Sequence, residues 1–155
     1  MEPWPMTEAR RQLPALLDKV RGGRWQLIGR RGRPEVVLAE AGEMAAMLAP
    51  VFRFHPEVDI DAGDVGVYLH ELDVHGVGGT LDEALDDLAE AMLEYADDWV
   101  DHLRHAPNHA PRAGYVRRIE IAGDTEGVVA MLNADADADA QAASCAEGAE
   151  NPNAQ

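Results

Sequence analysis

The chain has 155 residues, of which 46% are hydrophobic and 5% aromatic, and it carries a formal net charge of −16. This composition is ordinary for a soluble globular protein. No run of about 18 apolar residues occurs, and the stretch before Thr7 is too short and proline-rich for a signal peptide, so we expect a cytoplasmic protein without a membrane partner. A single cysteine, Cys145, excludes an intramolecular disulfide.

Charge is unevenly distributed along the chain. Residues 1–34 contain eight Lys and Arg against three Asp and Glu, a net charge of +5, whereas the remaining residues contain five against 26, a net charge of −21. An acidic chain repels nucleic acid, so a basic head must act locally, within a Debye length of about 8 to 10 Å. The split predicts two binding tasks on one polypeptide.

The first predicted element is a helix with Thr7 as its N-cap. Pro14 predicts a kink or a restart in this helix, and Gly22 and Gly23 predict its end. Apolar residues at spacings of three and four form one stripe, which comprises Ala9, Leu13, Leu16, Leu17 and Val20.

A basic hairpin and a short helix follow. Residues 25–28 and 35–39 are β-prone and flank a turn that contains Gly32 and Pro34, and residues 41–49 form a helix that Pro50 ends. A unit of residues 1–50 has little core of its own, so we expect it to form a homodimer. The expected dimerisation residues are Leu13, Leu16, Leu17 and Val20.

Residues 51–132 predict a second unit. Residues 51–61, 65–72 and 74–77 are strand-like, and Thr80 with Glu83 forms a capping box at the start of a long helix. The apolar stripe of this helix comprises Leu85, Leu88, Met92, Ala96, Trp99 and Leu103. Residues 115–122 predict a further strand and residues 126–132 a short helix. Residues 133–155 contain no large apolar side chain and are expected to be a disordered tail.

The stretch from Met6 to Leu38 resembles the N-terminal domain of the Phd/YefM family of type II antitoxins. The resemblance rests on Thr7-Glu8-Ala9-Arg10 at the start of a helix, on Gly22-Gly23, and on Leu27-Ile28-Gly29-Arg30-Arg31-Gly32-Arg33-Pro34 before Val36-Val37-Leu38. It implies a dimer that binds operator DNA and represses its own operon. The implied DNA-contacting residues are Arg10 and Arg30, with Arg31 and Arg33 as helpers, and we also expect Arg11 to bind DNA. Pro3 and Pro5 depart from the family's initial strand and predict an irregular or edge strand there.

Residues 51–122 resemble a HicB-like antitoxin domain. The resembling residues are Gly66-Val67-Tyr68-Leu69 and Gly76-Val77-Gly78-Gly79-Thr80-Leu81-Asp82-Glu83-Ala84-Leu85. The two resemblances together imply an α+β antitoxin: a DNA-binding head, a β-β-β-α-β domain and a tail. They also imply a basic, RelE-like RNase toxin as partner, held by the acidic face of the long helix and the apolar edge of the sheet. The expected toxin-binding residues are Leu69, Leu72, Glu90, Glu94 and Asp98.

Three alternatives stay open. The arginines could form an ordinary solvated surface, and the acidic helix face could serve solubility alone. The region from His102 to His109 could belong to a small metal-binding protein or enzyme, although Pro107 interrupts the helical spacing that a metal site would need. A repressor without a toxin partner is the third alternative. We expect no catalytic function and no cofactor, because no nucleophile arrangement or Gly-rich phosphate loop is present.

Overall fold

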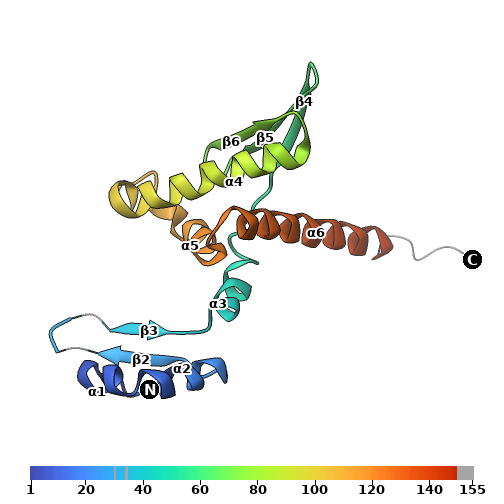
Figure 1. Cartoon of the computed structure of the whole chain (residues 1–155). Helices are drawn as coiled ribbons and strands as arrows, with labels where there is room; N and C mark the ends of the chain where they lie inside the picture. Colours follow the sequence, from blue (N-terminus) through green and yellow to red (C-terminus); the bar gives the residue numbers. More distant parts are fainter. Residues whose placement is uncertain (30, 34, 150–155) are drawn as a thin grey trace, which may run out of the picture. The chain divides into compact units, whose positions relative to one another are not determined.

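The computed structural model describes residues 1–29, 31–33 and 35–149. The chain forms two compact units, Met1–Met47 and Leu48–Gln155. Both contain helices and a three-stranded sheet, so the chain is α+β (Figure 1). In the described part of the chain, no helix is long and apolar enough to cross a membrane.

Two short helices open the first unit. α1 (Met6–Arg11) and α2 (Leu13–Arg21) are separated by Gln12, and Pro14 occupies the first turn of α2, so the predicted restart is confirmed. A proline is tolerated there because first-turn amides have no helical partner. The predicted cap is wrong: Thr7 lies inside α1, which begins one residue after Pro5 and has no side-chain cap. The second helix ends at Gly22, as predicted.

A small sheet lies beside these helices. β1 (Trp4–Pro5) is a two-residue edge strand, which pairs in parallel with β2 (Gln26–Gly29). Antiparallel pairing of β2 with β3 (Val36–Leu38) confirms the predicted hairpin. α3 (Ala41–Leu48) follows, and the Glu40 carboxylate accepts hydrogen bonds from two of its first-turn amides at 3.0 and 2.7 Å. These bonds favour the ionised carboxylate and lower the pKa of Glu40.

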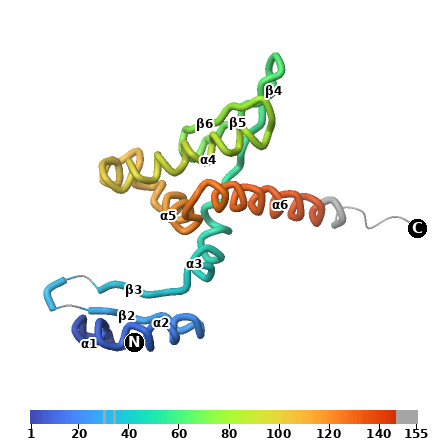
Figure 2. The backbone as a smooth tube through the Cα atoms, in the orientation of Figure 1, coloured from blue at the N-terminus to red at the C-terminus, as the bar shows by residue number. Residues whose placement is uncertain are grey.

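The sheet of the second unit is an antiparallel meander of β4 (Glu57–Asp61), β5 (Asp64–Leu69) and β6 (Val74–Gly78), in that order. Ala62 and Gly63 connect the first two strands with φ of +51° and +99°. Two consecutive left-handed residues are typical of the tight turn that matches strand twist in a hairpin. The smooth trace in Figure 2 shows this meander leading into the long helix.

α4 (Leu81–Asp98) covers one face of this sheet and continues into the π-helical turn Trp99–Leu103. The predicted capping box is present: the Thr80 hydroxyl accepts from the Glu83 amide at 3.2 Å, and the Glu83 carboxylate accepts from the Gly79 amide at 2.9 Å. A side chain at Gly76 would lie 2.3 Å from the backbone of α4, so only glycine permits this close approach. The predicted apolar stripe is buried from Leu85 to Trp99.

The predicted strand at residues 115–122 is wrong. A 3-10 turn, Ala110–Arg112, leads into α5 (Ala113–Ala122), so the second unit lacks the last strand of the expected β-β-β-α-β order. Val116 and Ile119 are both fully buried in the core. Residues three apart share a face in a helix but point to opposite faces in a strand, and the common core therefore selects the helix.

The predicted disordered tail is also wrong over its described part. α6 (Thr125–Ala149) runs far beyond Leu132, and residues 150–155 lie outside the described residues. Asp135 anchors this helix: its carboxylate accepts from the two terminal guanidinium nitrogens of Arg118 at 2.7 and 3.0 Å and from the Phe54 amide at 2.8 Å. The lack of large apolar side chains after residue 132 was the reason to expect disorder. In the structure, a buried ion pair holds this part of α6 against the core in their place.

Candidate nucleic-acid and partner-binding surfaces

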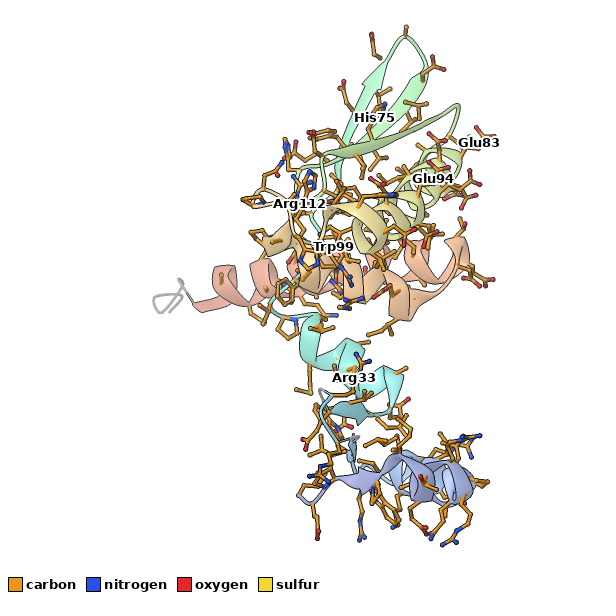
Figure 3. The ribbon with its side chains drawn as sticks, turned by 90° about the vertical axis from the view of Figure 1, so that its left-hand side faces the viewer. Arg33, His75, Glu83, Glu94, Trp99 and Arg112 are labelled. Atoms are coloured by element: carbon orange, nitrogen blue, oxygen red, sulfur yellow. The ribbon has the colours of Figure 1, made fainter. Side chains whose placement is uncertain are left out.

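Three of the predicted DNA-binding arginines gather around the β1–α1 junction and the end of β2. Arg10 and Arg31 line one shallow depression together with Gly29. Arg31 and Arg33 line an adjoining one, so Arg31 is common to both. All three arginines are exposed, and within the described residues no carboxylate forms an ion pair with them. Figure 3 labels Arg33 on the segment that precedes β3. Such free guanidinium groups can donate to phosphates or to guanine edges.

The other two predicted positions differ. Arg11 is exposed but donates through one nitrogen to both carboxylate oxygens of Glu8, at 2.8 and 2.6 Å. A guanidinium that is already paired with a carboxylate must exchange that partner to reach a phosphate. Arg30 lies outside the described residues.

The predicted dimerisation residues separate into two pairs. Leu16 and Val20 are buried within the first unit, where they form its own core. Leu13 and Leu17 are 44% and 36% exposed, and the hairpin adds exposed Val36 and Val37. Of the four predicted dimerisation residues, two therefore belong to the core of this unit and two are exposed on its surface.

The predicted toxin-binding residues also divide. Glu90, Glu94 and Asp98 are exposed on α4 (Figure 3 labels Glu94), and Asp98 accepts from His102 at 2.8 Å. Leu69 and Leu72 are fully buried in the core beneath α4, which corrects the prediction that they form an apolar edge for a partner. Leu69 is the last residue of β5 and Leu72 lies in the turn that follows, and both belong to the core that α4 covers.

The histidines of the alternative metal site have separate partners. His102 pairs with Asp98, whereas His109 contacts the Tyr95 hydroxyl at 2.8 Å and His105 is exposed. Arg112 also donates to the Tyr95 hydroxyl, at 3.1 Å. In the described parts of the chain, no group of three or more His, Cys, Asp or Glu side chains is arranged to hold a metal ion.

Sequence reasoning missed two polar contacts, one partly buried and one buried. Trp4 donates from its indole nitrogen to the Gln26 side chain at 3.0 Å, which ties β1 to β2. The Arg118–Asp135 pair ties α5 to α6. The second had a signal in the sequence: Val128, Leu132 and Asp135 recur at helical spacing, so the apolar stripe of α6 continues into a carboxylate.

The chain resembles known proteins both in fold and in sequence. Its fold is similar to a crystal structure of an antitoxin part of a putative toxin/antitoxin system from Syntrophomonas wolfei subsp. wolfei. The TM-score is 0.65 at 21% identity, over 84% of this chain and 96% of that chain, and at this identity the likeness concerns the fold alone. A PHD-like family model, described as antitoxin of toxin-antitoxin, RelE / RelB, TA system, matches residues 1–135. The chain therefore belongs to this family of antitoxins. A search of curated proteins found no match.

Proposed function

We propose that this antitoxin binds its operator DNA through a Phd/YefM-type N-terminal unit and neutralises a basic RNase toxin of the RelE type through its second unit. The protein acts by binding and carries out no reaction of its own. The observation that carries the proposal is the cluster of exposed arginines Arg10, Arg31 and Arg33 in the N-terminal unit of a chain that is otherwise strongly acidic.

Local charge is the reason why this cluster favours DNA. Screening limits an exposed charge to about one Debye length, so a phosphate near the cluster is attracted even though the whole chain is acidic. A homodimer, formed through the exposed apolar residues Leu13 and Leu17, presents two clusters to the two halves of a symmetric operator. Repression follows when the occupied operator overlaps the promoter of the antitoxin's own operon.

The DNA half of the proposal is tested with the variant R10A/R31A. Each protomer loses two guanidinium groups, so affinity for a promoter fragment of the same operon is expected to fall about 100-fold. The slope of log affinity against log salt is expected to become shallower by about three to four, because a dimer loses four phosphate contacts. Fluorescence anisotropy over a salt series measures both quantities.

Arg21 provides the matched control for this test. It is an exposed arginine of the same unit, paired with Asp18 at 3.4 Å near the end of α2, and it lines neither depression. The variant R21A is expected to bind DNA within about twofold of the wild type, since distant surface charges are screened. Unchanged DNA affinity in R10A/R31A, with its circular dichroism spectrum retained, contradicts the assignment.

The toxin half is tested through the acidic face of α4. Complementary charge mainly accelerates association, so E90Q/E94Q is expected to slow binding of the operon's toxin about tenfold at low salt and less at high salt. Stopped-flow mixing measures this rate. The control E126Q/D137N removes two exposed carboxylates from α6 and is expected to change the rate about twofold or less. Equal slowing by both variants shows a general charge effect and contradicts the assignment of α4.

A further inference from the structure

The outer strand of the second unit, β4, is exposed at all five of its residues. It forms one edge of the sheet, because the strand order is β4-β5-β6 (Figure 1). An edge strand presents a row of backbone N–H and C=O groups that a further strand can complete. Proteins commonly protect such edges with short strands, charged side chains or covering segments, and β4 is a five-residue strand that carries three acidic side chains.

The turn of the hairpin decides which backbone groups of β4 point outward. A two-residue turn closes on the pair Asp61↔Asp64, and a closing pair of this kind exchanges both backbone hydrogen bonds. Because the two types of pair alternate, Asp59 and Glu57 also bond inward to β5. The N–H and C=O groups of Val58 and Ile60 therefore face the free edge.

The opposite edge of the same sheet is capped at one backbone position by the protein itself. The outward N–H of Val77 on β6 donates to the Asp87 carboxylate of α4 at 2.9 Å. On β4, by contrast, no side chain of the described residues forms a hydrogen bond to the backbone of residues 57–61. On β6, the Asp87 side chain thus caps the Val77 amide, whereas no side chain of the described residues caps the backbone of β4.

The two faces of β4 differ in chemistry. Val58 and Ile60 lie opposite Val67 and Val65, on the face that α4 covers farther in, yet they are 52% and 71% exposed. The other face carries Glu57, Asp59 and Asp61, so apolar and acidic side chains alternate strictly. An added strand would extend the apolar face on one side and meet three carboxylates on the other, of which Glu57 is already paired with His70 at 3.0 Å.

The three carboxylates of β4 determine which kind of strand can pair with its free edge. Antiparallel pairing of β4 with a second copy, centred on Asp59, would place Asp59 opposite Asp59 and Glu57 opposite Asp61, and directly opposed like charges are destabilising. A strand with Lys or Arg at every second position turns the same three contacts into attractions. The pattern therefore disfavours pairing of β4 with a second copy and favours a basic strand.

We propose that the free edge of β4 pairs with an exposed strand of a basic partner protein, in which lysine or arginine alternates with apolar residues. The identification of this partner as the toxin rests on the proposed function. Backbone pairing through Val58 and Ile60 supplies the hydrogen bonds, and the alternating side chains set register and specificity.

The first experiment uses the full chain and a disulfide-cyclised hairpin peptide whose outer strand alternates lysine and valine. Cyclisation lowers the ordering cost of binding. Saturating peptide is expected to slow hydrogen exchange of the Val58 and Ile60 amides by at least about tenfold, as measured by NMR, because both amides gain an acceptor. A peptide with glutamate in place of lysine is expected to leave their exchange unchanged.

Two variants at one position separate backbone pairing from side-chain contact. I60P removes an outward N–H without breaking the ladder to β5, and it is expected to weaken lysine-peptide binding at least about tenfold. I60T keeps the N–H and is expected to bind within about threefold of the wild type. Equal binding by I60P overturns the proposal, as does protection of other segments by the lysine peptide while these two amides exchange freely. Slow exchange that depends on protein concentration, without peptide, identifies a second copy as the occupant and also overturns it.

Co-expression with the toxin of the same operon distinguishes this inference from the proposed function. Failure of the wild-type chain to retain that toxin overturns the proposed function, whereas the peptide result stands by itself. Retention of the toxin by I60P with wild-type affinity overturns the inference alone. The exchange measurement on the wild-type protein needs no variant, so a folding defect in I60P leaves the test intact.

Discussion

The buried ion pair between Arg118 and Asp135 supports a stability prediction for the second unit. Both side chains are almost fully buried, with 6% and 5% of their surfaces exposed. The carboxylate of Asp135 receives three hydrogen bonds, two from the guanidinium group and one from the Phe54 amide. The substitution D135A removes all three acceptor contacts at once while alanine keeps the helical propensity of α6.

The expected loss of unfolding free energy follows from what the substitution leaves behind. Breaking a buried pair by removing one partner costs about 3 to 5 kcal/mol, because the remaining charge stays buried without compensation. Arg118 still donates to the Phe52 carbonyl at 2.8 Å, which keeps the expected loss near the lower figure, about 3 kcal/mol. D135A also leaves the Phe54 amide without its acceptor. Because both contacts belong to one hydrogen-bond network, this effect is already included in the expected loss of about 3 kcal/mol.

Urea unfolding, followed by the fluorescence of buried Trp99 and by circular dichroism, measures this loss. The matched control is D137A, an exposed aspartate two residues farther along α6, which is expected to change stability by about 0.5 kcal/mol or less. A loss below about 1 kcal/mol in D135A refutes the assignment of this pair as the anchor of α6. The double variant R118M/D135L is expected to recover most of the loss, since a well-packed apolar pair can replace a buried ion pair.

Two further predictions concern the sheet of the second unit. The substitution G76A places a methyl group 2.3 Å from the backbone of α4, and we expect it to lower the free energy of unfolding in urea by about 3 kcal/mol. The control is G66A, whose methyl group has its nearest neighbour at 3.9 Å and is expected to cost about 0.5 kcal/mol or less. Equal losses in the two variants would contradict the close helix–sheet packing. Tyr68 donates to the Asp73 carboxylate, and this hydrogen bond raises the pKa of Tyr68. The bond therefore adds stability that is present below the ordinary tyrosine pKa of about 10. This stability is lost as the pH rises through the pKa of Tyr68 in the folded protein. Asparagine keeps the left-handed backbone at position 73, so D73N is expected to return the phenolate absorbance titration of Tyr68 toward its ordinary range; an unchanged titration would contradict the hydrogen bond.

Local signals in the sequence were sufficient for several elements. Pro14 predicted the restart between α1 and α2 because a proline lacks the amide that a helix interior needs, and Thr80 predicted the start of α4 through its capping box. The hairpins were readable for the same reason: turn residues and alternation act over a few positions. The antitoxin class was also recognisable from local motifs, although the matching family model supports the antitoxin assignment alone and not the HicB-like resemblance of the second unit.

The errors arose where distant residues decide the local structure. Residues 115–122 became a helix because Val116 and Ile119 share one core, and α6 extends past Leu132 because Asp135 finds Arg118 in the preceding helix. Leu69 and Leu72, expected at a partner surface, are buried because α4 covers their face of the sheet.

The sequence by itself determined the charge segregation, the start of α4, the hairpin turns and the antitoxin class, because each depends on residue identity at short spacing. The tertiary structure alone decided which arginines gather, which leucines remain exposed and which edge of the sheet stays open. The physical reason is that burial and pairing depend on neighbours in three dimensions. The same alternating pattern of side chains is core in β5, which α4 covers, and is exposed in β4 at the edge of the sheet.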